Sequence, residues 1–227
     1  SSFMTVRTLF PIALLACGVA TAPAFAEEKR EALYESTLDI DRDGKMDRAV
    51  LVVVGGPGGR TDFGAMSDER YGLEGEESVD LYIYLAAGDE KLDLSRKPTF
   101  LKKGIADTEQ TNWVQPLENT DKGSLIATFV YGWGARQTWG ESLTIVHRGG
   151  EFLVAGYTRD WEWGNEVHKA DGSWDVETRI GGCDINYLTG KGTMYRVLDE
   201  YQPMKGTFKL VKLADWQVGK RPKACEF

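Results

Sequence analysis

Side chains alternate between apolar and polar along several stretches of this chain, and that period of two residues constrains the fold more than any other feature. The aromatic residues between Tyr157 and Trp163 share one parity, and the segment from Trp174 to Ile180 repeats the pattern. Such a period indicates half-buried antiparallel strands, in which successive side chains point to opposite faces. No segment has the pattern of a long capped amphipathic helix; only Glu28–Tyr34 is consistent with a short helical start.

Further segments have the composition of strands, and turn signals separate them. Gly149-Gly150, Asp171-Gly172 and the run from Thr189 to Gly192 mark tight hairpins, and 26 glycines suit a chain with many turns. We therefore predict an all-β domain, an antiparallel meander that is partly propeller-, sandwich- or barrel-like. These strands are Arg48–Val54, Val79–Ala86, Thr99–Ile105, Ser124–Tyr131, Glu141–Arg148, Phe152–Arg159, Cys183–Leu188 and Thr193–Leu198.

The region from Gly55 to Asp80 departs from this pattern. It opens with four glycines and a proline at 55–59 and then stays polar, with few apolar anchors. This composition is typical of a long Gly-rich surface loop, which can form part of a binding rim. The glycines match neither phosphate-binding motif and no helix start follows them, so we expect no nucleotide site.

The N-terminal region has the composition of a bacterial export signal. One positive charge, Arg7, precedes an apolar run from Leu9 to Val19, and Ala24-Phe25-Ala26 supplies the small-residue pattern that a signal peptidase cuts. The run is too short for a permanent membrane-spanning helix. We predict a signal peptide with a short N-terminal extension at 1–26 and a single β domain at 27–227, periplasmic or secreted.

A lipoprotein signal is a second interpretation of the same segment. The run Leu14-Leu15-Ala16-Cys17 loosely resembles a lipoprotein cleavage site, and a lipid on Cys17 would hold the protein on a membrane. Leu15 stands where a smaller residue is usual, so we favour the free form. Both interpretations place the mature protein outside the cytoplasm.

Removal of the signal leaves two cysteines, Cys183 and Cys225. An even count in an oxidising compartment favours a disulfide, which would tie the C-terminal segment to the strand around Cys183. The alternative, a reactive redox pair, lacks the C-x-x-C spacing of such pairs.

The length of the chain limits the number of domains, and its net charge limits the classes of partner. About two hundred residues remain after cleavage, which is enough for one well-cored domain. The net charge of −8 becomes about −9 without Arg7. This acidity argues against binding to nucleic acid and to anionic membrane surfaces.

The sharpest motif is an acidic loop that runs from Asp39 to Asp47. Carboxylates stand at its positions one, three, five and nine, a glycine at position six makes the turn, and a backbone carbonyl is available at position seven. Ca²⁺ takes six to eight hard oxygen ligands, and four carboxylates this close repel one another without a cation. We predict a structural calcium site; the alternative is an acidic turn without metal. The predicted ligands are Asp39, Asp41, Asp43, the carbonyl of Lys45, and Asp47.

The loop is not a helix–loop–helix EF-hand, because its twelfth position is Val50, which offers no carboxylate. A D-x-D-x-D-G-x-x-D loop that leads directly into a buried apolar strand resembles the calcium loop of FG-GAP (integrin α-propeller-like) repeats. The resemblance covers Thr37–Gly55 in single copy and implies a metal that fixes a hairpin. The best second match, around Asp171–Asp175, lacks half of the ligands, so we expect an open or partly closed meander instead of a closed propeller.

A second resemblance lies in the C-terminal half. The segments Glu141–Ile145, Gly150–Tyr157 and Asn186–Lys191 are together similar to a signature of exported bacterial proteins with no assigned activity. The resemblance supports the β fold and implies no particular function.

All seven tryptophans lie between Trp113 and Trp216, in part as two dense aromatic clusters. Flat rings on a β-surface, beside arginines and acids, suit stacking against sugar rings or gripping a peptide. The alternative is cross-strand packing inside the core. We expect a surface for a glycan or a cell-envelope protein, and its candidate residues are Trp133, Arg136, Trp139, Tyr157, Trp161 and Trp163.

The sequence carries no catalytic motif of the common kinds. The two histidines, His147 and His168, are too few for a zinc site of usual composition, and no nucleophile elbow or metalloprotease motif occurs. Asp160, Glu162 and Glu166 offer paired carboxylates for polysaccharide hydrolysis, although acids at alternate strand positions are an ordinary solvent face. The sequence favours a non-catalytic exported binding domain, with a cell-wall hydrolase as the alternative.

Overall fold

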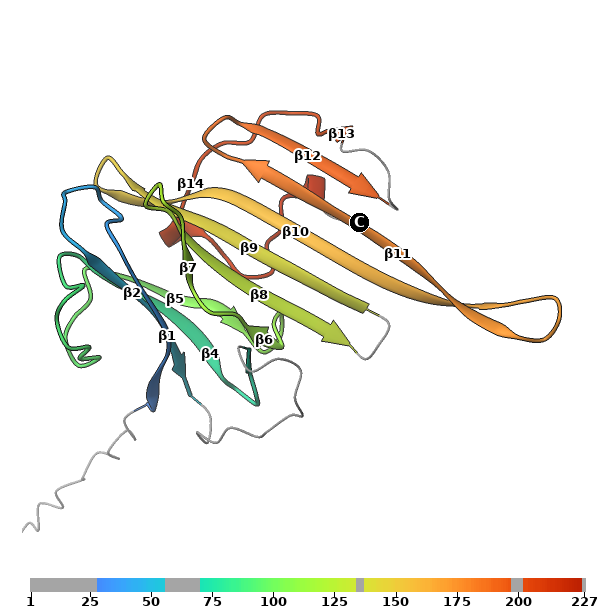
Figure 1. Ribbon diagram of the computed structural model, residues 1–227, viewed down its shortest axis with the longest axis horizontal. Helices are drawn as coiled ribbons and strands as arrows, with labels where there is room; N and C mark the ends of the chain where they lie inside the picture. Colours follow the sequence, from blue (N-terminus) through green and yellow to red (C-terminus); the bar gives the residue numbers. More distant parts are fainter. Residues whose placement is uncertain (1–27, 56–69, 134–136, 197–201, 226–227) are drawn as a thin grey trace, which may run out of the picture.

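The structure is a computed structural model that describes residues 28–55, 70–133, 137–196 and 202–225. These residues form two antiparallel sheets, one with strand order β1-β2-β4-β5 and a larger one with order β13-β12-β11-β10-β9-β8-β6-β3 (Figure 1). β7 pairs with β8, and β14 pairs with β10. The strands are β1 (Arg30–Leu38), β2 (Asp47–Val54), β3 (Tyr71–Gly72), β4 (Ser78–Tyr84), β5 (Phe100–Asp107), β6 (Trp113–Val114), β7 (Glu118–Asn119), β8 (Leu125–Trp133), β9 (Gln137–Arg148), β10 (Glu151–His168), β11 (Trp174–Asn186), β12 (Lys191–Arg196), β13 (Gln202–Pro203) and β14 (Val211–Lys212), and the 3-10 helices are η1 (Leu213–Asp215) and η2 (Lys223–Cys225).

The predicted all-β fold is confirmed. Every pairing among the described strands is antiparallel, and neighbouring strands are mostly consecutive in the chain, as in a meander. The two sheets of described strands pack face to face as a sandwich around a shared apolar cluster.

The main core lies between the two sheets. Alternate residues of β2 and β4 face the larger sheet and are fully buried, namely Ala49, Leu51, Val79, Leu81 and Ile83. This is the alternation that the period of two residues predicts. The larger sheet contributes Leu125, Ala127, Leu143, Ile145, Val154 and Ile185 to the same apolar cluster.

Strand β2 is buried on both of its faces. Val50, Val52 and Val54 point away from the larger sheet and pack beneath Leu92 and Leu94 of the β4–β5 connection. Double burial explains why the sequence of β2 is a nearly continuous apolar run and not an alternating one.

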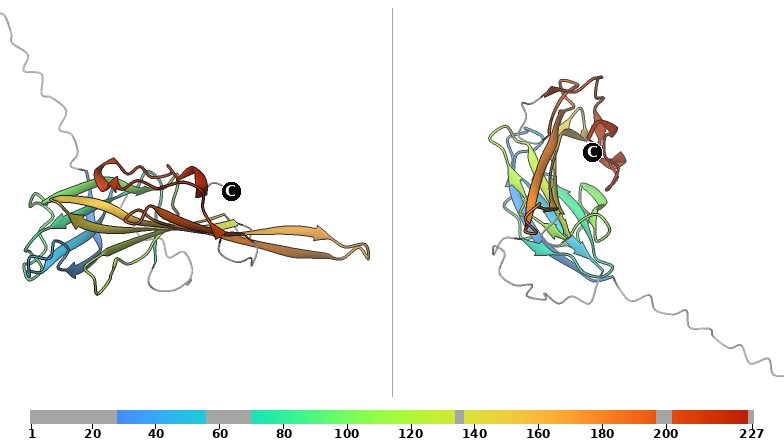
Figure 2. Two further views of the ribbon diagram at one scale, coloured as in Figure 1. Left: turned by 90° about the horizontal axis from the view of Figure 1, so that it is seen from above. Right: turned by 90° about the vertical axis from the view of Figure 1, so that its right-hand side faces the viewer.

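A C-terminal segment, residues 202–225, packs on the larger sheet as part of the same core (Figure 2). Leu213 and Trp216 belong to the apolar cluster between the sheets, and Nζ of Lys102 in β5 donates to the carbonyl of Trp216. Cys225 is bonded to Cys183 of β11, with their Cα atoms 5.6 Å apart, so the predicted disulfide is confirmed. The bond fixes the far end of the segment to the sheet.

Local structure departs from expectation at three places. The short helical start expected over Glu28–Tyr34 is wrong, because Arg30–Leu38 is a strand whose backbone pairs with β2. Within the loop expected over Gly55–Asp80, residues 70–80 contain β3 and the start of β4, while 56–69 lie outside the described residues. The two segments expected around residues 174–180 and 183–188 are one strand, β11.

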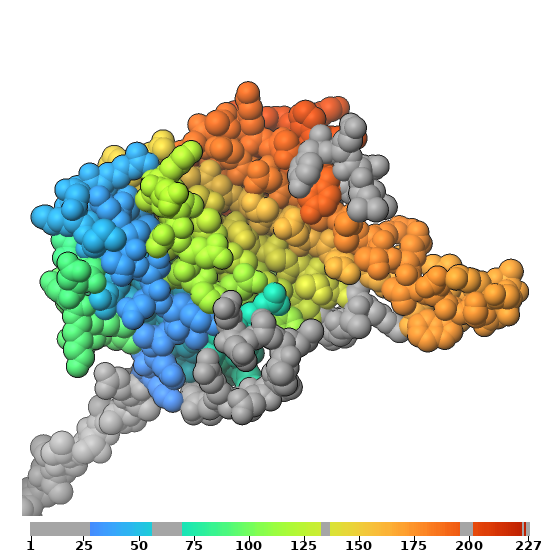
Figure 3. Space-filling model, in the orientation of Figure 1, coloured from blue at the N-terminus to red at the C-terminus, as the bar shows by residue number. Residues whose placement is uncertain are grey.

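Strands β10 and β11 continue past the sandwich as a two-stranded arm. β9 accompanies β10 only to Trp163, and β12 accompanies β11 only from Gly181. Residues 164–180, called the arm from here on, therefore have no third strand beside them among the described residues. The arm projects from one end of the molecule in Figure 1 and in the left panel of Figure 2, and the space-filling view shows it standing clear of the body (Figure 3).

The predicted signal peptide at 1–26, with Cys17, lies outside the described residues, as does Arg136. In the part of the chain that is described, no helix is long and apolar enough to cross a membrane.

Removing the disulfide is expected to lower the free energy of unfolding by about 4 kcal/mol, since the bond closes a long loop in the unfolded chain. The cysteines are 42 positions apart in sequence. Urea unfolding of the double variant Cys183→Ala/Cys225→Ala measures the loss, and reductant should bring the unsubstituted protein to the same midpoint. An unfolding curve that reductant leaves unchanged would contradict the structural role.

Candidate functional site

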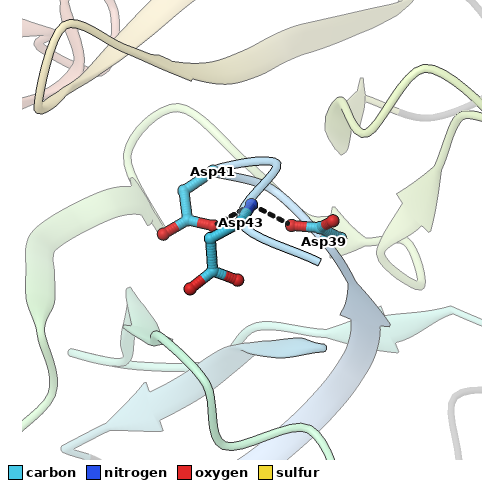
Figure 4. Close-up of side chains that lie close together, drawn as sticks. All are labelled: Asp39, Asp41 and Asp43. Carbon is cyan, nitrogen blue, oxygen red and sulfur yellow. Dashed lines mark hydrogen bonds between the residues drawn. The ribbon is translucent and has the colours of Figure 1, made fainter. Parts of the chain in front are cut away.

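Three aspartates converge in the turn between β1 and β2. Asp39, Asp41 and Asp43 each present one carboxylate oxygen, and these atoms lie within 4.8 Å of one another (Figure 4). Arg42 and Gly44 have left-handed backbone conformations, with φ of 63° and 85°. Glycine adopts such a φ without a Cβ clash, so the predicted turn residue stands where the chain bends.

Backbone N–H groups of the turn bind the same carboxylates. The N–H of Asp43 donates to Oδ1 of Asp39 and to Oδ1 of Asp41, both at 3.1 Å, and the N–H of Gly44 donates to Oδ2 of Asp39 at 3.0 Å. Nζ of Lys45 lies 3.8 Å from Oδ2 of Asp43. Clustered hard oxygen donors on a compact turn fit Ca²⁺, and Asp39, Asp41 and Asp43 are the residues that would hold it.

Asp47, the fourth predicted carboxylate, has a different position. Its side chain is buried at the start of β2, where Oδ2 accepts a hydrogen bond from the N–H of Ile40 at 2.8 Å and Oδ1 accepts one from the N–H of Ala86 at 2.7 Å. Burial raises the pKa of this carboxyl group, although both backbone hydrogen bonds oppose the shift. Asp47 ties the turn to the β4–β5 connection and is not one of the three converging carboxylates; the role of the Lys45 carbonyl stays a prediction.

The turn is held from the other sheet as well. Nη2 of Arg42 donates to the carbonyl of Lys122, in the β7–β8 turn, at 2.9 Å. Gly123 approaches so closely that a Cβ there would stand 2.7 Å from the carbonyl oxygen of Asp39. The shape of the acidic turn therefore depends on contacts with both sheets.

A row of aromatic side chains crosses three strands of the larger sheet. Tyr131 of β8, Trp139 of β9 and Trp161 of β10 are successive cross-strand partners, so they share one face. The rings of Tyr131 and Trp139 stack, with centroids 3.9 Å apart and planes inclined by 16°. On β11 the row ends at Gly181, where a Cβ would stand 2.4 Å from the indole of Trp161. The missing side chain lets this indole extend over β11.

Two arginines and one carboxylate hold Trp139 in place. Nε of Arg221 lies 2.8 Å and Nε of Arg159 lies 3.6 Å from Oε1 of Glu141. Both guanidinium carbons are close to the Trp139 ring, 5.5 Å from its centroid for Arg221 and 5.8 Å for Arg159, which is within cation–π range. Nη1 of Arg159 also donates to the carbonyl of Cys225 at 3.0 Å. The C-terminal segment thus supports the aromatic row.

A mainly apolar hollow opens beside this row, at the base of the arm. Trp139, Trp161 and Trp163 line it, and Trp163 is 47% exposed. Flat apolar walls with a few convergent polar groups are the general form of a small-ligand site. The polar residues around the hollow are Gln137, Arg159, Glu162, Asn165 and Arg179.

Of the six residues predicted for ligand binding, the structure brings Trp139, Trp161 and Trp163 together. Tyr157 is instead a core residue: its side chain is fully buried and its ring centroid lies 5.4 Å from that of Trp216. Burial, with the neighbouring Glu141 carboxylate, raises the pKa of Tyr157. The backbone of Trp133 pairs with β9, but its side chain lies outside the described part of the chain, as Arg136 does.

The acids considered for hydrolysis do not converge on the hollow. Asp160, Glu162 and Glu166 alternate along β10 on the face opposite the tryptophans, and all three are exposed. Asp160 accepts a hydrogen bond from the hydroxyl of Tyr195 at 2.7 Å. Among the described residues that line the hollow, Glu162 at its edge is the one carboxylate.

Several residues of the hollow were not anticipated from the sequence. The shared parity of Arg159 with Trp161 is visible in the sequence, but Gln137 and Arg179 come from neighbouring strands and are brought beside the tryptophans by the inter-strand register. Arg221, which contacts Trp139 from the C-terminal segment, has no local sequence signal either.

No family model, no curated protein and no solved structure matches this chain. The functional conclusion therefore stands on the geometry of the site.

Asp47→Asn is expected to lower the free energy of unfolding by about 1–3 kcal/mol, measured by denaturant unfolding with a chelator present to exclude metal effects. The amide has one acceptor oxygen, so one of the two buried N–H groups would face an NH₂ group and lose its hydrogen bond. The matched control is Asp41→Asn, which keeps the single oxygen that accepts from Asp43, and its effect should be within about 0.5 kcal/mol. Equal losses in the two variants would contradict the distinction between Asp47 and the converging aspartates.

Proposed function

We propose that this protein is an exported, non-catalytic β-sandwich that binds a carbohydrate of the cell envelope in the aromatic hollow. The observation that carries the proposal is the set of three tryptophans, from β9 and β10, that line one partly open apolar hollow. Sugar rings have apolar faces that stack on indoles and hydroxyl groups that need hydrogen bonds at the edges.

The polar edge of the hollow has the composition that sugar hydroxyls require. Gln137 and Asn165 offer amide donors and acceptors, and Arg179, in the same register row as Trp163, offers a half-exposed guanidinium. Arg159 is buried and already engaged with Glu141 and Cys225, so its part is to hold Trp139.

Binding is favoured over hydrolysis by the acids around the hollow. Glycoside hydrolysis by the common mechanisms uses two carboxyl groups that flank the scissile bond. Among the described lining residues Glu162 is the one acid, so the paired-acid alternative has no second carboxylate there.

The acidic turn supports a structural role for calcium. The β7–β8 turn that contacts it leads into β8, and Tyr131 lies six residues after Leu125, the first residue of that strand. Six extended residues span about 20 Å. A metal on Asp39, Asp41 and Asp43 would therefore rigidify the far end of the sandwich and not touch a sugar in the hollow.

An extracytoplasmic location is part of the proposal. The Cys183–Cys225 disulfide is compatible with an oxidising compartment such as the periplasm or the outside of the cell. Calcium and envelope glycans are both found there.

Calcium is expected to raise the melting temperature of the purified protein, since a ligand at one hundred times its Kd stabilises the native state by about 2.7 kcal/mol. Asp43→Ala should abolish the shift because it removes one of three converging carboxylates. Asp171→Ala, at an exposed hairpin turn with its own Asp–Ser hydrogen bonds, should keep it. Thermal scans with chelator and with added calcium make the comparison. An unchanged melting temperature in the unsubstituted protein would contradict the metal proposal.

Trp163→Ala is expected to weaken glycan binding about tenfold or more, because truncating a central aromatic contact commonly costs above 1 kcal/mol. Trp174→Ala is the matched control, since Trp174 is 64% exposed on the same hairpin but on its opposite face. Affinity electrophoresis and calorimetry with a panel of envelope oligosaccharides and soluble peptidoglycan fragments supply the measurement. Absence of binding throughout the panel, or equal loss in both variants, would contradict the proposal.

A further inference from the structure

The face of the arm that points away from the aromatic hollow has different chemistry on its two strands. On β10 this face carries Glu166 and His168; on β11 it carries Trp174, Val176 and Thr178, followed by Ile180 at the base. These residues share a face because Glu166 pairs with Val176 and His168 pairs with Trp174. Glu166 thus lies directly beside the exposed apolar side chains of β11.

Water covers much of this apolar stripe in the isolated chain. Trp174 is 64% exposed and Val176 is 48% exposed. A two-stranded ribbon with no third strand is marginally stable in water, and exposed apolar groups rimmed by charge are typical of a protein–protein contact. The arm has the properties of a docking element.

The net charge of the arm favours a basic partner. Its acids are Glu166 on the docking face, Asp171 at the tip, and Asp175 and Glu177 on the opposite face. Its cations, Lys169 and Arg179, each lie beside an acid of the arm itself. Nζ of Lys169 is 2.8 Å from Asp175, and Nη2 of Arg179 is 3.9 Å from Glu177. A net negative arm disfavours an anionic membrane surface and favours a protein surface with lysines.

The same chain carries a surface of the complementary kind. In the C-terminal segment Leu210 is 44% exposed, and the exposed Lys205 and Lys209 precede it closely in sequence. The described part of this segment, residues 202–225, has six cations, Lys205, Lys209, Lys212, Lys220, Arg221 and Lys223, against Asp215 alone. Two of these cations already pair within the chain, Lys212 with Glu151 and Arg221 with Glu141. We call Lys205, Lys209 and Leu210 the basic strip.

The arm cannot reach the basic strip of its own molecule. The N–H of Met204 donates to the carbonyl of Gly192, and the N–H of Phe208 donates to that of Gly190. The strip therefore lies by the β11–β12 turn, whereas the arm tip lies at the other end of β11. The thirteen residues of β11 separate these two ends by about 40 Å.

We propose that the arm docks on the basic strip of a second copy of this chain, and that two copies do so reciprocally. Because arm and strip stand at opposite ends of one long axis, copies placed antiparallel about a two-fold axis bring each arm to the partner's strip. Such an isologous arrangement closes as a dimer. Glu166 then faces Lys205 and Lys209, and Trp174 and Val176 cover Leu210.

Sedimentation velocity over a concentration series measures the oligomeric state of the mature protein and so tests the dimer. We expect a dimer whose dissociation constant rises with salt, because the exposed charge contacts are screened. Trp174→Ser/Val176→Ser should raise that constant at least tenfold. Val167→Ser is the matched control, since Val167 is 40% exposed on the opposite face of the same arm, and it should leave the constant unchanged.

A charge exchange distinguishes reciprocal docking from a general loss of fold. Glu166→Lys and Lys205→Glu/Lys209→Glu should each be monomeric alone, and an equimolar mixture should form a heterodimer in which both contacts are again complementary. A monomer at every concentration, an open polymer, or a mixture that stays monomeric would overturn the proposal. These outcomes are independent of glycan binding, which Trp163→Ala tests on the other face.

Discussion

The register of β8, β9, β10 and β11 is the constraint on which the rest of this structure depends. Along these strands the rows of cross-strand partners change character in order. The row through Tyr157 is core, the row through Glu141 and Arg159 is charged, and the row through Trp139 and Trp161 is aromatic. A slip of one residue would move every one of these side chains to the other face. The positions of the core side chains, of the ion pairs that support Trp139 and of the tryptophans in the hollow therefore all depend on one ladder of backbone hydrogen bonds.

The ordering of these rows explains how one sheet serves both stability and recognition. The apolar rows lie beneath the smaller sheet and the C-terminal segment, which bury them. The charged row follows under the end of the C-terminal segment, where Arg159 is buried and Glu141 satisfies Arg159 and Arg221 together. Buried ion pairs contribute little to stability by themselves but specify a unique arrangement in some proteins. Here that arrangement places two guanidinium groups against Trp139.

Much of the fold could be predicted from local sequence, and most of the site could not. The alternation of side chains along residues 157–163 and the turn residues between segments predict the strands, because both signals depend only on residues that are neighbours in sequence. The disulfide followed from counting cysteines. The helical start expected at Glu28–Tyr34 failed because pairing with β2 overrides weak local preference. The row from Tyr131 to Trp161, the burial of Tyr157 and the support from Arg221 depend on partners from other strands, and no local pattern encodes them.

The ionic support of Trp139 also has a consequence for how the protein folds. Arg221 meets Glu141 across 80 positions of sequence, and Arg159 meets the Cys225 carbonyl across 66. Contacts of such separation close large loops at an entropic cost, and a high contact order slows folding. The hairpins β8–β9 and β10–β11 are local and can pair early. The hollow acquires its fixed shape only when the C-terminal segment has closed over them, so recognition is the last property of the chain to mature.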